Sequence, residues 1–280
     1  MPTYETPEAI SVNAHVGAGS IQFTASERTD TVVEVQPSNP KRDKDVKASE
    51  QTEVAFTGGV LTVRTKERRM IGPSGAVTVT VDLPAGSSVD LTGSWTHVTG
   101  EGRLGTVDVK TSGGDFRLDT TGPLRLKSAH GSIRVGRVEG MAEITASSSN
   151  VRVGLVDGHA VLKNAHGTTT IDAVTGELRV SGAHGDIEIG RAESSVAATT
   201  AHGALRVGDV ARGTVQLETS FGAIEVGIRE GTAAWLDANA ENGQVRNTLT
   251  ASEAPAESED SVKVRARTKW GNIDVRRAAH

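Results

Sequence analysis

Apolar and polar residues alternate along most of this chain in short runs that recur at a nearly constant spacing. Each repeat holds two pairs of apolar residues, two positions apart within a pair, and a small polar corner separates the pairs. The pattern is clear in GPLRLKSAHGSIRVGRVE and GTVQLETSFGAIEVGIRE, which begin at Gly122 and Gly213. Because a spacing of two places side chains on one face of a strand, each repeat predicts two half-buried β-strands.

A glycine, or a serine in its place, marks the start of successive repeats. These positions are Gly105, Gly122, Gly140, Gly158, Gly176, Ser194, Gly213 and Gly231. A unit of two strands and two turns cannot bury its own apolar face, so such units stack on one another. An antiparallel sandwich also alternates, but it gives no reason for a constant repeat length. The sequence therefore predicts an all-β fold, a β-solenoid with about 18 residues in each coil.

A second column of glycines lies at the corner between the two strands of a repeat. It consists of Gly131, Gly167, Gly185, Gly203 and Gly222. We expect positive φ at this corner, a conformation that glycine adopts without the steric cost of a Cβ atom.

The two ends of the chain depart from the repeat. Residues 1–104 alternate without a fixed period and include a charged loop at 37–50, so we interpret them as an irregular β-rich N-terminal cap, continuous with the solenoid. The solenoid itself is expected over 105–280. Within it, the acidic segment 251–261 predicts a loop or arm, and the strand-like residues after it predict the coil that closes the stack.

Several segments resemble a bacterial putative-adhesin family, a domain of unknown function. They are SERTDTVVEVQPSNP, VTVDLPAGSSVDL, the repeated AHG corner units and the closing VRARTKWGNIDVRR. The resemblance runs from about residue 8 to residue 277 and implies a single-stranded, right-handed β-solenoid. The family name transfers no catalytic or binding residues to this chain.

Composition removes several classes of function. The chain has no cysteine, which excludes disulfides, cysteine nucleophiles and cysteine-ligated metals, and its net charge of −5 argues against a nucleic-acid partner. The sequence contains no run of about 18 apolar residues, so it predicts no membrane-spanning helix. The first residues lack a signal-peptide pattern, so we expect a cytoplasmic protein, with a secreted or surface location as the alternative.

No catalytic motif stands out, and we predict no enzyme and no cofactor. Nucleophile elbows, phosphate loops and H-E-x-x-H are absent from the sequence. Outward positions such as Arg134, Glu143 and Arg152 carry mixed charges, which is typical of a solvated strand face. Because β-helices also host lyases and glycosidases with clustered carboxylates, a carbohydrate-active enzyme is the alternative.

Two sets of residues are candidates for binding. The scarce aromatic residues Trp95, Phe221 and Trp270 stand at or beside turns, where they either contact a partner or close a cap. Four histidines share the corner position of the repeats: His130, His166, His184 and His202. At a coil spacing of about 4.8 Å this column is a candidate metal site, although parallel side chains favour a simple repeated turn residue.

Together these observations predict a non-enzymatic binding or scaffold protein, adhesin-like, that contacts another macromolecule through its regular face or its ends. The expected partner is a protein or a cell-envelope glycan. A further alternative is end-to-end self-assembly, because a solenoid can polymerise through an open terminal edge.

Overall fold

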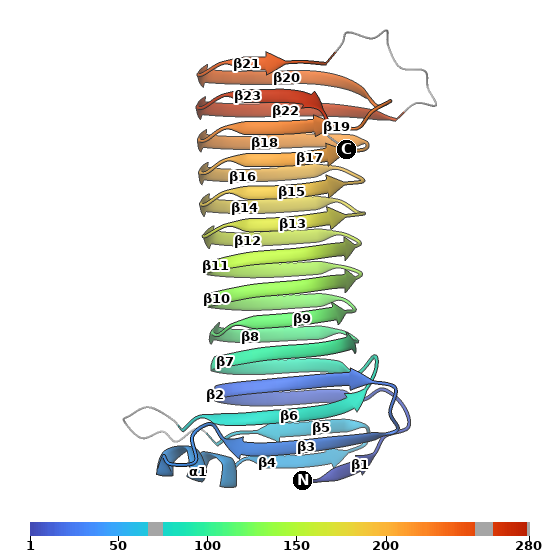
Figure 1. Ribbon diagram of the computed structural model, residues 1–280, viewed down its shortest axis with the longest axis vertical. Coiled ribbons are helices and arrows are strands. Elements are labelled where there is room, and N and C mark those ends of the chain that lie inside the picture. The colour runs from blue at the N-terminus through green and yellow to red at the C-terminus, as the bar shows by residue number, and fades with distance from the viewer. Residues whose placement is uncertain (67–74, 250–259, 279–280) are drawn as a thin grey trace. The chain divides into compact units, whose positions relative to one another are not determined.

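The computed structural model describes residues 1–66, 75–249 and 260–278, and almost all regular structure in these ranges is β-strand (Figure 1). The predicted all-β solenoid class is confirmed. The chain forms two compact units, unit 1 (Met1–Glu139) and unit 2 (Gly140–His280).

Unit 1 combines long strands with short ones and a single helix among its described residues. Its elements are β1 (Thr3–Glu5), β2 (Ser11–Ser26), β3 (Asp30–Pro37), α1 (Asp43–Glu50), β4 (Glu53–Thr57), β5 (Val60–Arg64), β6 (Val77–Pro84), β7 (Ser88–Leu104), β8 (Val107–Gly113), β9 (Phe116–Thr121) and β10 (Leu124–Glu139).

Parallel, in-register pairing in unit 1 starts well before residue 105. The first half of β2 pairs in parallel with β5 and β7, and its second half pairs in parallel with β6 and β7. Strand β7 then pairs with β8 and β9, which in turn pair with β10. Coil-like stacking therefore includes β2 and β7, within the region that the sequence analysis interpreted as irregular.

The remaining strands of unit 1 pair in the antiparallel direction. Strand β1 pairs with β3 and β3 with β6, while β4 pairs with β5. The rings of Tyr4 on β1 and Phe56 on β4 lie 5.2 Å apart and so bridge the two edge strands. At this end of unit 1, the contact between Tyr4 and Phe56 and the short lengths of β1 and β4 limit the exposed strand edge.

The charged segment 37–50, expected to be a loop, contains helix α1 instead. Asp43 and Asp45 lie in the first turn, where the helix dipole favours acidic side chains, and Lys47 lies in the last turn. The Asp45 side chain is buried and accepts a hydrogen bond from the backbone N–H of Ala76, at 3.0 Å. That tertiary contact has no counterpart in the local sequence pattern.

Unit 2 contains the regular repeat. Its strands are β11 (Ala142–Asp157), β12 (Ala160–His166), β13 (Thr169–Val174), β14 (Leu178–His184), β15 (Ile187–Ala192), β16 (Val196–His202), β17 (Leu205–Val210), β18 (Gly213–Phe221), β19 (Ile224–Ile228), β20 (Ala233–Asn242), β21 (Val245–Asn247), β22 (Ser261–Trp270) and β23 (Ile273–Arg277).

From β12 to β19, each coil of unit 2 contributes one strand to each of two parallel ladders, and the long strand β11 pairs with the first strand of both. Strands β12, β14, β16 and β18 pair in sequence in the first ladder. Strands β13, β15, β17 and β19 pair in the same way in the second. Burial alternates at the start of each of these strands, as the two-residue period predicted, and β19 departs from the alternation at its end, where Gly227 and Ile228 are both buried.

The last strands in the sequence are not the last in space. Strand β22 pairs with β18 on one side and with β20 on the other, and β23 lies in the same way between β19 and β21 (Figure 1). The expectation that residues after the acidic segment form the closing coil is therefore wrong. They form the penultimate coil, because the chain leaves a gap after β19 and later fills it. The acidic segment itself lies almost wholly outside the described residues.

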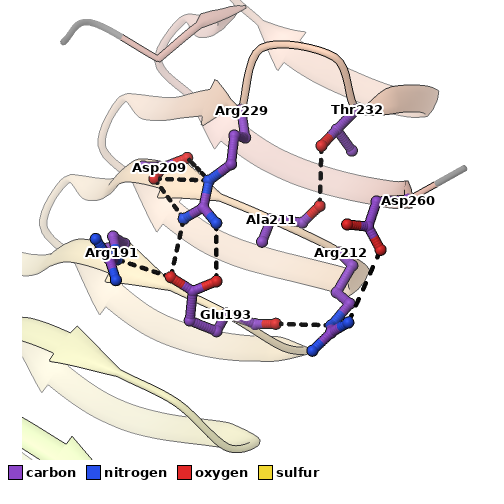
Figure 2. Close-up of polar contacts among 8 residues, drawn as sticks. All are labelled: Arg191, Glu193, Asp209, Ala211, Arg212, Arg229, Thr232 and Asp260. Atoms are coloured by element: carbon purple, nitrogen blue, oxygen red, sulfur yellow. Dashed lines mark hydrogen bonds and ion pairs between the residues drawn. The ribbon is translucent and has the colours of Figure 1, made fainter.

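Arg229 connects three successive coils where the chain leaves this gap (Figure 2). Its guanidinium donates to both oxygens of Glu193, at 2.8 and 3.1 Å, and to Asp209, with the shortest contact at 2.6 Å. Arg191 adds a second ion pair to Glu193 at 2.7 Å. Arg277 donates to the carbonyls of Arg229 and Thr232, at 2.9 and 2.8 Å. The crossing from β19 to β20 is thus held from both sides.

Arg229 also lowers the pKa of the Glu193 carboxyl, because the guanidinium hydrogen bonds stabilise the charged form. A lowered pKa in the folded state means that the unfolded chain binds the proton more readily. The resulting stability is complete above the ordinary glutamate pKa and is lost as pH falls toward the lowered value.

The core assignment predicts different outcomes for two adjacent residues on β15. Ile187 is 3% exposed, so Ile187→Asp should lower the free energy of unfolding by several kcal/mol, because it buries an unpaired charge. Glu188 points outward and accepts from Arg206 at 3.0 Å, so Glu188→Ala should cost under about 1 kcal/mol. Urea unfolding measures both, and equal losses would refute the assigned faces.

The Arg229 contacts predict a pH-dependent loss in Glu193→Gln. At pH 7 the substitution should lower the free energy of unfolding by up to about 1 kcal/mol, a value reduced by partial solvent exposure. The difference from the unsubstituted chain should shrink between about pH 5 and pH 3. Glu177→Gln is the control, since that carboxylate is more exposed and binds Arg179 locally. A Glu193→Gln effect that is constant over this range would contradict the assignment.

Candidate functional site

One corner of unit 2 brings a line of ring side chains to the surface. Strands β12, β14 and β16 each end in histidine, and β18 and β22 end in Phe221 and Trp270. Backbone pairing places each of these residues opposite the next. We call this set the ring ladder: His166, His184, His202, Phe221 and Trp270.

The first four rings of the ladder stack face to face. The centroids of His166 and His184 are 5.0 Å apart with an interplanar angle of 4°, and those of His184 and His202 are 4.8 Å apart at 18°. Phe221 continues the stack 4.9 Å from His202, at 6°. The spacing equals the separation of hydrogen-bonded strands, so the rings inherit the period of the backbone.

The glycine after each ring residue sets this register. Gly185 has a φ of +133°, and a Cβ atom on it would overlap the carbonyl oxygen of Gly167 in the neighbouring coil. Its N–H donates to the carbonyl of His202 at 2.8 Å. Positive φ is thus confirmed at four of the five predicted corner glycines. Gly222 differs because its φ is not positive, yet close contact with Gly203 still excludes a side chain.

Inward hydroxyl groups support the same corner. Two positions before the ring, Thr219 donates to the carbonyl of Gly203 at 3.1 Å, and Thr268 donates to that of Gly222 at 3.0 Å. These carbonyls face the protein interior, where an unpaired acceptor is costly. At the corners of Phe221 and Trp270, these threonines therefore support the turn that leaves the ring pointing outward.

The ladder is open to solvent. All three of its histidines are exposed, and Phe221 and Trp270 retain 49% and 55% of their surface. Ser148 and Asn242 occupy the same register position in the coils beyond the two ends of the ladder. Phe221 and Trp270, two of the predicted contact residues, therefore share one line on unit 2.

The other predicted residues, Trp95 and His130, belong to unit 1. Trp95 on β7 is 55% exposed and lies opposite Gly113. A Cβ atom on Gly113 would come within 2.6 Å of the indole, so this glycine makes room for the ring. His130 on β10 is paired with Gly113 from the other side and is exposed.

The histidine column does not converge on a point. Stacked rings with nearly parallel planes direct their nitrogen atoms the same way, whereas tetrahedral ligation needs ligands that converge. Over residues 1–66, 75–249 and 260–278, no three histidine or carboxylate side chains are arranged to hold a metal ion.

Sequence reasoning missed Trp235, which is 54% exposed on β20. The ammonium of Lys263 lies 4.8 Å from its ring centroid. Trp235 occupies an outward position in the strand period, and that position was the available signal. All three tryptophans of the chain are thus about half exposed.

Charges on the outward faces pair with one another. Arg206 contacts Glu188 at 3.0 Å and Glu225 at 3.4 Å. In the basic C-terminal strands, Arg267 pairs with Asp237 at 2.7 Å. These arrangements agree with the predicted solvated faces.

None of the described helices has the length and apolar character needed to cross a membrane.

Comparisons with known proteins show what the chain resembles. No curated protein matches the sequence. Among solved structures, one described as a putative adhesin from Bacteroides fragilis is 17% identical, with a TM-score of 0.37 over 98% of this chain and 95% of that chain. Another, described as a putative lipid binding protein from Parabacteroides distasonis, is 10% identical, with a TM-score of 0.44 over 99% of this chain and 96% of that chain.

A family model gives the firmer result. The Toastrack DUF4097 model matches residues 8–276, nearly the full span over which the sequence resembled a putative-adhesin family. That resemblance is confirmed. The chain belongs to the Toastrack DUF4097 family.

Proposed function

We propose that this chain is a non-enzymatic binding protein and that the ring ladder of unit 2 contacts a macromolecular partner. The observation that carries the proposal is a line of stacked rings left at the surface of a chain that has only eight aromatic residues. Exposed aromatic side chains on a rigid support are common anchors of protein interfaces.

The stack gives the surface its rigidity. His184 and His202 each have a neighbouring ring on both faces, and the glycine corner fixes their backbone. A partner that covers these side chains loses little conformational entropy on the ladder side, because the rings are already ordered. Phe221 and Trp270, at 49% and 55% exposure, supply the apolar area to be buried.

The orientation of the rings favours a protein partner over a glycan. Sugar rings pack against open aromatic faces, whereas the faces of His184 and His202 are covered by neighbouring rings. What these two histidines offer is ring edges, with imidazole nitrogens that donate or accept hydrogen bonds, on rings whose centroids are about 5 Å apart. Polar and aromatic side chains of a protein surface match such edges.

The outward carboxylates argue against the alternative of a glycosidase or lyase. A general acid in such enzymes needs a raised pKa, but Arg229 lowers that of Glu193. Glu188 and Glu225 both form ion pairs with Arg206, at 3.0 and 3.4 Å. A cytoplasmic location stays a prediction, which fractionation of the native cells would check.

Site-specific photocrosslinking tests the proposed surface. Because the chain has no cysteine, Thr168→Cys beside the ladder and Thr175→Cys at the opposite corner of the same coil each create a single labelling site. After benzophenone-maleimide labelling, the Thr168→Cys chain should crosslink a protein from native cell extract that the Thr175→Cys chain does not. Phe221→Ala should weaken binding of that protein by about tenfold or more.

Three results would contradict the proposal. Identical crosslinking from both corners would remove the ladder as the contact surface. Unchanged affinity in Phe221→Ala would remove the aromatic anchor. Binding of a purified cell-envelope glycan that is lost in Phe221→Ala would overturn the choice of a protein partner.

A further inference from the structure

The last coil in space, β20 with β21, is paired on one side only within the described residues. Strand β20 pairs with β22, and β21 pairs with β23. On the other side, no strand in the described part of the chain binds the alternate backbone N–H and C=O groups of β20 and β21. Such an edge is a template for another strand.

The inner face of this coil is apolar and incompletely covered. Ala234, Leu236 and Ala238 lie in register with buried residues of β22, but each keeps an intermediate exposure. Val245 on β21 is 46% exposed although its partner Ile273 is fully buried. The end of the unit 2 core therefore shows apolar side chains together with free main-chain groups.

The sequence of β20 lacks the features that usually protect an edge. It has no proline and no lysine, and its ten residues make it long for an edge strand. Of its carboxylates, Asp237 is already neutralised by Arg267 at 2.7 Å. By contrast, β4 at the edge of unit 1 is short, and its Glu53 pairs with Lys66 at 2.8 Å.

We propose that β20 and β21 form a self-association edge, through which two copies of this chain join by antiparallel pairing of β20 about a two-fold axis at Ala238. A strand edge related to itself by a two-fold axis pairs antiparallel. The coils of unit 2 before the last one each pack against a similar coil, so a second terminal coil meets a compatible core.

The charges on β20 select the register of this pairing. With Ala238 opposite its symmetry mate, Leu236 faces Ala240 and Trp235 faces Glu241. Asp237 then faces Asn239. Shifting the axis to Asp237 sets two aspartates opposite each other, and shifting it to Asn239 sets Asp237 against Glu241. Like charges directly opposite on paired strands destabilise the pairing.

The contact is small, which sets its strength. A strand of ten residues is about 33 Å long and the two sheets lie about 10 Å apart, so the shared end buries a few hundred Å² on each copy. That is the low end for specific interfaces, so the dimer should dissociate on dilution into the low micromolar range.

A single introduced thiol tests the register. Under mild oxidation Ala238→Cys should give a disulfide-linked dimer in high yield, because residues directly opposite each other lie within disulfide reach. Asn239→Cys is the matched control on the same strand. The Cα atoms of its two cysteines would be about 8 Å apart, which is beyond disulfide reach, so this variant should stay mostly monomeric. Equal yields from the two variants would refute the register.

Sedimentation velocity of the unsubstituted full chain tests the association itself. Between about 1 and 200 µM the average mass should rise from monomer toward dimer. Ala238→Lys should stay monomeric with an unchanged melting temperature, whereas Asn239→Lys on the outward face should still dimerise. A monomer at every concentration, including with Ala238→Cys, would overturn the proposal. Phe221→Ala should dimerise normally, which separates this edge from the ring ladder.

Discussion

The close approach of backbones at the glycine corner is the constraint on which unit 2 depends. The N–H of one corner glycine donates to the next coil, while its Cα faces a carbonyl of the preceding coil with no room for a side chain. This contact fixes the height of each coil and the register of both sheets. The stacked rings, the paired outward charges and the alternating core all follow from that register.

The same constraint explains how an interruption is tolerated. Strands β22 and β23 enter between two earlier coils and keep full register with both, because Gly271 repeats the corner conformation. Arg229, drawn in Figure 2, and Arg277 secure the crossing that leaves the gap. The chain thereby places its less protected strands, β20 and β21, at the outside.

The repeat could be predicted from sequence because it is local. The two-residue spacing of apolar positions predicts the burial of residues such as Val215, Leu217 and Ile224. The insertion of β22 could not be predicted, since its pattern fits any layer of the stack and only pairing with β18 and β20 decides which. Helix α1 was not predicted for a related reason. Its charged residues are typical of a loop, and the hydrogen bond from the Ala76 N–H to Asp45 is a tertiary contact that the local sequence does not indicate. For the ladder, spacing predicted the histidine column, but its outward direction and ring stacking came from the corner geometry.

Denaturant unfolding of two glycine variants tests the central constraint most directly. Gly185 and Gly231 both have positive φ, but a Cβ atom meets the neighbouring backbone only at Gly185, while the space at Gly231 is open. The account predicts that Gly231→Ala lowers the free energy of unfolding by about 1 kcal/mol, from backbone strain alone. Gly185→Ala should lower it by about 3 kcal/mol or more, because two coils must also move apart. Equal losses in the two variants would contradict the claim that coil-to-coil backbone contact organises this fold.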